Sequence, residues 1–220
     1  MAKIIRAFIN ISGPSFIPIV EGERLANRER GKRPTTFNAS ADGIAISADG
    51  ATLYYCSLSS RHLYSVPTVL LLDRSSEDTV VGQAVNDLGE KGASDGLESD
   101  DNGHVYAGDY EHDSIRQRQT DGEWKTIAHD PQILRSDRLS VAANGYLYFT
   151  VNQVERQPLF HEGIDLREKP YTNVAALGAF PEKTDQPFLF LLFGNTLILP
   201  GAAEGEQGIK IDLIQILQPL

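Results

Sequence analysis

The sequence is poor in the residues and motifs that mark several kinds of site. It holds one cysteine, Cys56, among 220 residues, together with one tryptophan and one methionine. A single cysteine excludes an internal disulfide and any metal site built from several thiolates. The sequence also has no nucleophile elbow, phosphate-binding loop or zinc-ligand spacing, so no common catalytic motif suggests an activity.

Positive charge and long apolar runs are scarce as well. The 30 acidic residues outnumber the 20 basic ones, which gives a net charge of -10. Such a field repels phosphate backbones and anionic lipid, so we expect no nucleic-acid partner and no membrane partner. Prolines and polar residues interrupt residues 1–20, where we recognise no signal peptide. The most apolar window, 187–200, is shorter than the roughly 20 residues of a spanning helix.

A short motif occurs three times in the chain. Each copy opens on an aspartate, has a glycine eight positions later, and continues into an aromatic, strand-like run. The copies occupy residues 42–55, 95–106 and 137–149. Their first aspartates, Asp42, Asp95 and Asp137, are 53 and 42 residues apart. This spacing is close to the roughly 40 to 50 residues of a propeller blade.

The local chemistry of each copy predicts a strand, a tight turn and a returning strand. Asp-Gly and Asn-Gly pairs supply the positive φ angles that short hairpin turns require. Further strands are predicted at 62–72 and 123–128, and the β-branched stretch beside Pro67 argues against a helix there. Such pairs recur in any all-β protein, so a sandwich is the alternative. Three copies with the same eight-residue interval and the same aromatic strand favour an all-β propeller.

An ordered set of segments resembles the major royal jelly and yellow family, in particular its bacterial members. The matching segments are 41–47, 58–68, 92–97, 144–153, 165–167 and 169–171. The resemblance implies a six-bladed β-propeller, distantly related to gluconolactonase-type propellers, of which this chain would hold about three to four blades. Many family members are secreted, but without a recognisable signal peptide the localisation stays open.

The resemblance divides the chain into three parts. Residues 1–37 form a poorly matched lead-in, 38–171 the blades, and 172–220 a divergent apolar tail. The tail predicts a hairpin around Gly194-Asn195 and a strand at 209–217. It is either a further blade beside the Asp137 unit or the product of a frame error, and we expect it to pack poorly.

The lactonase relatives imply a divalent metal in the central channel, held by acidic and amide side chains. By their place in the motif, Asp42 and Asp95 are the candidate ligands, and their hard oxygens suit Ca²⁺. Such a metal could polarise a lactone carbonyl. The alternative is that each aspartate accepts hydrogen bonds from the backbone of its own turn.

The candidate channel lining also includes Asp137, Asn152 and Gln153. The third copy departs from the family pattern, because Arg135-Ser136 precedes Asp137 and Arg138 follows it. An arginine beside the channel opposes a bound cation. The two amides either point at a channel ligand or satisfy a turn. A separate acidic turn, formed by Asp109, Glu111 and Asp113, is expected to be a solvated loop.

The sequence leaves three hypotheses for the function. The first is a propeller that binds a small molecule in its central channel, and the second is a metal-dependent, lactonase-like hydrolase. The third is a truncated product without activity, so whether the protein is an enzyme stays open. A row of blades that does not close leaves apolar sheet faces bare, which predicts self-association.

Overall fold

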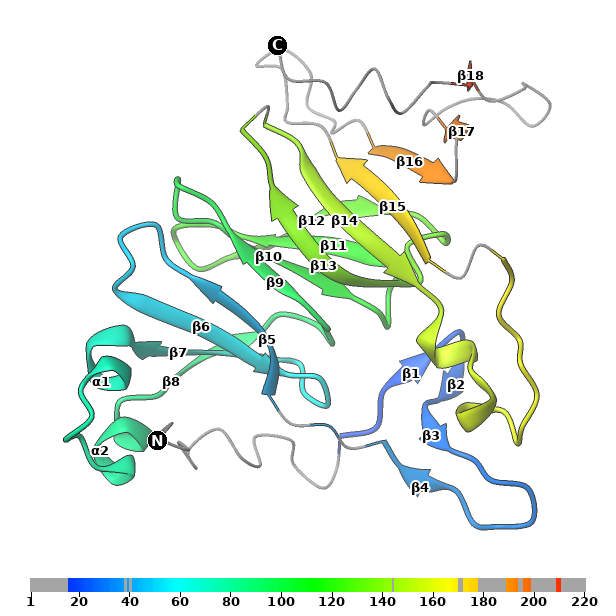
Figure 1. The fold of residues 1–220 in the computed structure, drawn as a ribbon, viewed down its shortest axis with the longest axis horizontal. Coiled ribbons are helices and arrows are strands. Elements are labelled where there is room, and N and C mark those ends of the chain that lie inside the picture. Colours follow the sequence, from blue (N-terminus) through cyan, green and yellow to red (C-terminus); the bar gives the residue numbers. More distant parts are fainter. Residues whose placement is uncertain are drawn as a thin grey trace.

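The computed structural model describes residues 16–37, 39, 41–143 and 145–169, and strands at 172–177, 189–193, 196–198 and 209–210. Antiparallel strands dominate these residues and form five sheets. Three of the sheets lie in a row, and the first strand of each contacts the first strand of the next (Figure 1). The chain is therefore a partial β-propeller, as predicted, and we number its three blades in chain order.

Each blade is a meander in which neighbouring strands pair in sequence order. The first blade consists of β5 (Ala41–Ile46), β6 (Thr52–Ser57), β7 (His62–Pro67) and β8 (Asn86–Glu90). The second consists of β9 (Leu97–Ser99), β10 (Val105–Asp109), β11 (Ser114–Arg118) and β12 (Trp124–His129). The third begins with β13 (Arg135–Val141) and β14 (Leu147–Asn152).

The repeated motif is the inner hairpin of each blade. Its second glycine, at Gly50, Gly103 and Gly145, has a φ of +70°, +85° and +82°. These values confirm the predicted turn role, because a residue with a Cβ rarely adopts them. Asn144, which precedes the third of these glycines, lies outside the described residues.

The first glycine of the motif has a different role from the predicted turn. Neither Gly43 nor Gly96 has a positive φ. A Cβ added to Gly43 would overlap the backbone oxygen of Asp95, and one added to Gly96 would overlap that of Asp137. Glycine is therefore required where one blade's inner strand lies directly against the next. In the third blade the exposed Arg138 takes this position.

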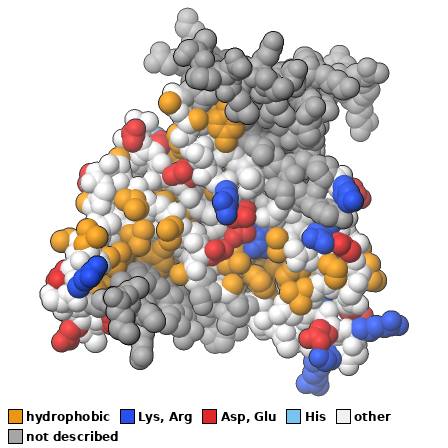
Figure 2. Space-filling model, in the orientation of Figure 1, with side chains coloured by type: hydrophobic (Ala, Val, Ile, Leu, Met, Phe, Trp, Pro, Cys, Tyr) orange, Lys and Arg blue, Asp and Glu red, His pale blue; other side chains and the backbone are white. Residues whose placement is uncertain are grey.

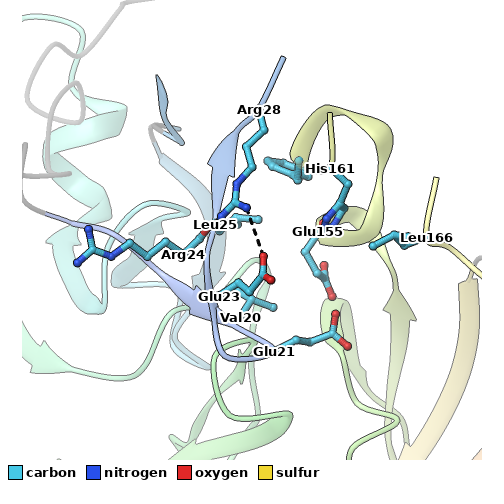
Figure 3. Close-up of a pocket in the computed structure, with 10 residues that line it drawn as sticks. Val20, Glu21, Glu23, Arg24, Leu25, Arg28, Glu155, His161 and Leu166 are labelled. Atoms are coloured by element: carbon cyan, nitrogen blue, oxygen red, sulfur yellow. Dashed lines mark hydrogen bonds and ion pairs between the residues drawn. The ribbon is translucent and has the colours of Figure 1, made fainter. Parts of the chain in front are cut away.

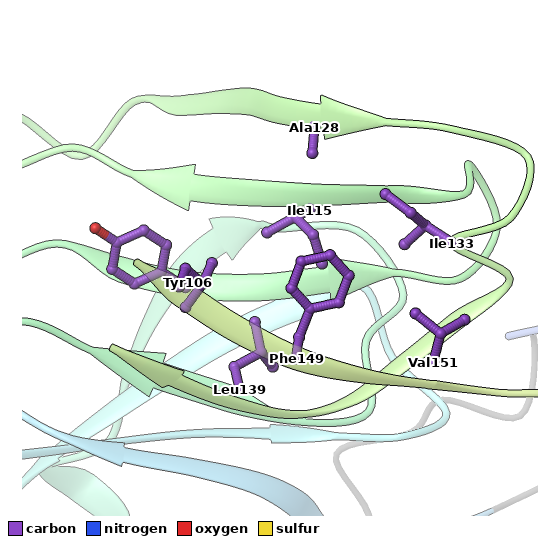
Figure 4. Packing of buried hydrophobic residues seen from close by; sticks show 8 residues of the cluster. Tyr106, Ile115, Ala128, Ile133, Leu139, Phe149 and Val151 are labelled. Atoms are coloured by element: carbon purple, nitrogen blue, oxygen red, sulfur yellow. The ribbon is translucent and has the colours of Figure 1, made fainter. Parts of the chain in front are cut away.

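The cores lie between the blades. Between the second and third, Ile115 and Ile133 face Phe149 and Val151 in a closely packed layer (Figure 4). Between the first and second, Cys56 and Leu63 pack with Leu97 and Ala107. Alternate residues of each strand point into these layers, which explains why the strand-forming runs of the motif are apolar and aromatic.

Two short helices separate the first two copies of the motif, where the sequence predicted only strand. They are α1 (Thr68–Leu72) and α2 (Asp78–Gln83). β7 ends at Pro67, whose φ of -63° suits the start of a helix, and the Thr68 hydroxyl donates to the Gly50 oxygen at 2.6 Å. This insertion accounts for the longer spacing between the first two copies. No helix among the described residues is long and apolar enough to cross a membrane.

The helices cover part of the free face of the first blade. Val81 of α2 packs on Tyr55 and Val66 of that face. Ile44 and Ile46 of β5 are 60% and 53% exposed, and hydrophobic side chains gather on the surface over β5 and β6 (Figure 2). Self-association through this blade face stays a prediction.

Two small hairpins precede the blades and pack against the segment that follows the third blade's inner hairpin. They consist of β1 (Ile19–Val20) with β2 (Glu23–Arg24), and β3 (Ala26–Asn27) with β4 (Thr35–Thr36). The later segment contains the 3₁₀ helices η2 (Val154–Arg156) and η3 (Pro158–Phe160). Val20, Leu25 and Phe160 share one buried cluster, which joins residues far apart in sequence.

The acidic turn after β10 is not the solvated loop that we predicted. Asp109 is buried, and the Glu111 side chain is only 4% exposed. Both Glu111 oxygens bind the Arg61 guanidinium at 2.7 Å, and one also accepts the backbone N–H of Ile19. The turn therefore ties the first blade and the N-terminal hairpin to the second blade.

The described strands of the tail extend the sheet of the third blade. β15 (Thr172–Leu177) pairs with β14 along its whole length, and β16 (Leu189–Phe193), β17 (Thr196–Ile198) and β18 (Ile209–Lys210) follow in order. The predicted hairpin around Gly194 is present, since Phe193 pairs with Thr196. How the tail side chains pack, and residues 211–217, lie outside what the structure describes.

Candidate functional site

Three aspartates, one from each blade, meet at the starts of the inner strands. Asp42 lies in β5, Asp95 comes just before β9, and Asp137 lies in β13. The Asp42 and Asp95 carboxyls share a hydrogen bond, and Asp137 is near enough to interact electrostatically with both. We call these three residues the aspartate cluster. Its role as a ligand site stays a prediction.

The strands that carry Asp42 and Asp137 pair irregularly at these residues. The β5–β6 register shifts between Ala41 and Ile44, and the β13–β14 register shifts between Ser136 and Leu139. Asp42 and Asp137 thus each lie in a β-bulge, which turns a side chain away from the regular alternation of a strand. The bulges explain how aspartates within strands can meet one another near the inner edge of the blades.

Arg135 supplies the positive charge of the cluster. Its Nε donates to Asp95 Oδ2 at 2.6 Å, and the two side chains are only 3% and 12% exposed. The guanidinium also lies over the Tyr110 ring, 5.0 Å from its centroid. The sequence marked Arg135 only as a departure from the family pattern, and its role as the ion-pair partner of Asp95 was missed.

The cluster raises the pKa of Asp42 to about 7. The main cause is the hydrogen bond to Asp95, followed by burial and by repulsion from Asp95 and Asp137, while Arg135 acts in the opposite direction. An unfolded aspartate releases its proton near pH 3.8. Stability from this group is therefore complete below about pH 4 and is lost as the pH rises through about 7.

The carboxylates as arranged do not fit a calcium ion. Arg135 already engages an oxygen of Asp95, and the pKa of Asp42 is raised to about 7, whereas Ca²⁺ takes 6 to 8 oxygen ligands. Among the described residues, no group of three or more His, Cys, Asp or Glu side chains is arranged to hold a metal. The calcium site at Asp42 and Asp95 stays a prediction that titration can test.

Asn152 and Gln153 use their amides in backbone contacts. Asn152 Oδ1 accepts the Val154 N–H at 3.1 Å. Gln153 Nε2 donates to the Glu168 oxygen at 2.8 Å, and its Oε1 accepts the Glu168 N–H at 2.9 Å. This is the turn-satisfying alternative that the sequence left open. A role for either amide in lining a ligand site stays a prediction.

The row of antiparallel blades with inner-strand carboxylates defines the class of the protein as a β-propeller. The family described as major royal jelly protein matches residues 13–168. The chain therefore belongs to the major royal jelly protein family, which confirms the resemblance seen in the sequence. No curated protein sequence matches the chain.

Several solved propeller-type structures are similar to the chain at low identity. A putative gluconolactonase is 16% identical with a TM-score of 0.46, over 85% of this chain and 66% of its own. A gluconolactonase from Xanthomonas campestris is 14% identical with a TM-score of 0.46, over 86% and 73%. The calcium-binding protein regucalcin from Agrobacterium tumefaciens strain C58 is 19% identical with a TM-score of 0.37, over 60% and 42%. Similarity at this level supports no conclusion about function.

Proposed function

We propose that this protein binds a small molecule at the aspartate cluster, in the central channel of the propeller. The observation that carries the proposal is the position of Asp42, Asp95 and Asp137 at the contacting first strands of three adjacent blades. Carboxylates that repel one another are unfavourable for stability. Unfavourable clusters of this kind are concentrated at functional sites, where binding a ligand can offset the repulsion.

The chemistry of the cluster favours a neutral ligand with several hydroxyl groups. Arg135 engages Asp95, whereas Asp42 is exposed and Asp137 is half-buried, so their oxygens are accessible. Carboxylate oxygens accept hydrogen bonds from hydroxyl groups, and a protonated Asp42 can also donate one. A sugar, a polyol or a sugar lactone offers several such hydroxyl groups.

The proposal predicts binding of hydroxylated compounds without added metal. In saturation-transfer NMR with a panel of sugars, polyols and sugar lactones, at least one compound should give a signal in calcium-free buffer. Asp42→Asn should weaken that signal, because the amide replaces an oxygen with a nitrogen that cannot accept. Asp101→Asn, the same change at an exposed residue of the second blade's hairpin turn, should have no effect.

The same experiment separates the other two readings. Binding that appears only after calcium is added would contradict our view of the cluster and favour the lactonase-like hydrolase. A folded protein that binds no compound of the panel, with or without calcium, would overturn the proposal and favour a product without activity. Equal signals from wild type and Asp42→Asn would place the ligand elsewhere.

A further inference from the structure

A pocket separate from the aspartate cluster lies between the N-terminal hairpin and the 3₁₀ segment after β14. It has a volume of about 310 Å³, which is the size of a small-molecule site. Val20, Leu25 and Phe160 give it an apolar wall, and Glu155 lines it from η2 (Figure 3). Neither the proposed channel ligand nor any motif in the sequence accounts for this pocket.

Glu155 has the least satisfied side chain in the pocket. The residue is 4% exposed, and neither carboxyl oxygen has a hydrogen-bond partner among the described residues. In Figure 3 its carboxyl group points away from its helix and toward the carboxyl of Glu21. Buried carboxyl groups are nearly always hydrogen-bonded, so two free oxygens in one pocket point to a ligand that binds them.

The cations near Glu155 are engaged elsewhere. Arg156 binds both oxygens of Glu21. Arg135 donates to Asp95 through Nε, while its Nη1 has no hydrogen-bond partner among the described residues. Arg28, which also lines the pocket, pairs with Glu23 at 3.3 Å. Arg24 also lines the pocket, but in Figure 3 its guanidinium points away from Glu155. No salt bridge to Glu155 is formed among the described residues.

Burial is the main cause that raises the pKa of Glu155 to about 7. The backbone N–H of Glu155 itself and the charges of Arg135 and Arg156 lower this pKa, while the Glu21 carboxylate raises it. Glu21, Glu23 and His161 also line the pocket, and His161 Nε2 lies 2.9 Å from the Glu155 backbone oxygen. A cation placed against Glu155 would favour the ionised carboxylate.

We propose that this pocket binds a small molecule with a guanidinium or amidinium head and an apolar body. Two parallel N–H groups of such a head match the two free oxygens of Glu155, as in arginine–carboxylate pairs. The apolar body would lie against Val20, Leu25 and Phe160. A single ammonium group would leave one of the two Glu155 oxygens unsatisfied. A planar guanidinium or amidinium group binds both oxygens at once and therefore fits the site better.

Benzamidine is the probe that tests this proposal, and benzamide is its neutral counterpart of the same shape. In calorimetry at pH 8, wild-type protein should bind benzamidine and should bind benzamide much more weakly. Glu155→Gln should weaken benzamidine binding by about 10- to 100-fold, the range expected for hydrogen bonds to a charged group. Glu162→Gln, an exposed change in the following turn, should bind like wild type.

The pH dependence provides a second readout. Wild-type affinity for benzamidine should fall about tenfold between pH 8 and pH 6, because Glu155 takes up a proton near pH 7. The affinity of Glu155→Gln should be flat over this range, and a slope as steep as that of wild type would contradict the role of Glu155. The variant removes a buried acid without a partner, so its melting temperature should equal or exceed that of wild type.

Equal binding of benzamidine and benzamide by wild type, or undiminished binding by folded Glu155→Gln, would overturn the proposal.

Discussion

Gly96→Ala is expected to lower the free energy of unfolding by about 3 kcal/mol, the upper end for overpacking a rigid site. The added Cβ would overlap the backbone oxygen of Asp137 and crowd Leu139, so the third blade must move away from the second. The neighbouring atom is backbone and cannot rotate aside. Urea unfolding followed by circular dichroism measures the loss.

Gly103→Ala is the matched control in the same copy of the motif. Its Cβ would lie 3.6 Å from Thr120 Cγ2, an ordinary contact, but its φ is +85°. It should therefore lose only about 1 kcal/mol from backbone strain. If the two variants lower the free energy of unfolding equally, Gly96 is not required for close packing between the blades, and our account of the motif is wrong.

Arg135→Met is expected to lower the free energy of unfolding by about 3 to 5 kcal/mol, because it leaves Asp95 buried without its cation. Asp95 is 8% exposed and has the arginine Nε 2.6 Å from its Oδ2. Methionine keeps part of the side-chain volume, so lost charge dominates the effect. Thermal and urea unfolding at pH 7.5 measure it.

A surface ion pair and a double variant serve as controls. Arg167→Met removes the partner of Asp165, a pair that is 25% and 39% exposed, and should cost less than about 1 kcal/mol. Adding Asp95→Asn to Arg135→Met should recover part of the loss, because no buried charge is then left alone. If Arg135→Met is as mild as Arg167→Met, Arg135 does not hold the cluster together.

Local signals in the sequence were sufficient to predict the blades. The eight-residue interval from Asp42 to Gly50 encodes a strand and a turn, and its repetition at Asp95 and Asp137 encodes neighbouring sheets. The aromatic run after each turn becomes the second strand of each blade. These features depend on residues close in sequence, which is why the pattern alone reveals them.

Features that depend on contacts between distant residues were not predictable in this way. Gly43 and Gly96 looked like turn residues, but the next blade's backbone determines their role. The helix α1 is only five residues long, too short for a periodic signal, and it follows a proline at the end of a strand. Glu155 lies in a stretch without any motif, and its pocket forms only when the N-terminal hairpin packs against it.

The site was predictable in part. The motif correctly placed its three aspartates at the first strands of adjacent blades, and their role as a ligand site stays a prediction. The partner of Asp95 was not identified, since a motif read along the chain cannot show that Arg135 reaches back across 40 residues to it. Asn152 and Gln153 were candidates by position alone, and their contacts with the backbone depend on the turns that follow β14.

The most direct test of the central claim, that carboxyl groups from successive blades meet at one site, is a carbon-13 NMR titration of the aspartate side chains. Our account predicts one aspartate carboxyl that titrates near pH 7, and its signal should be missing in Asp42→Asn. If every aspartate carboxyl titrates below about pH 5, the ordinary range for this group, then Asp42 and Asp95 do not form the close carboxyl pair that our account requires.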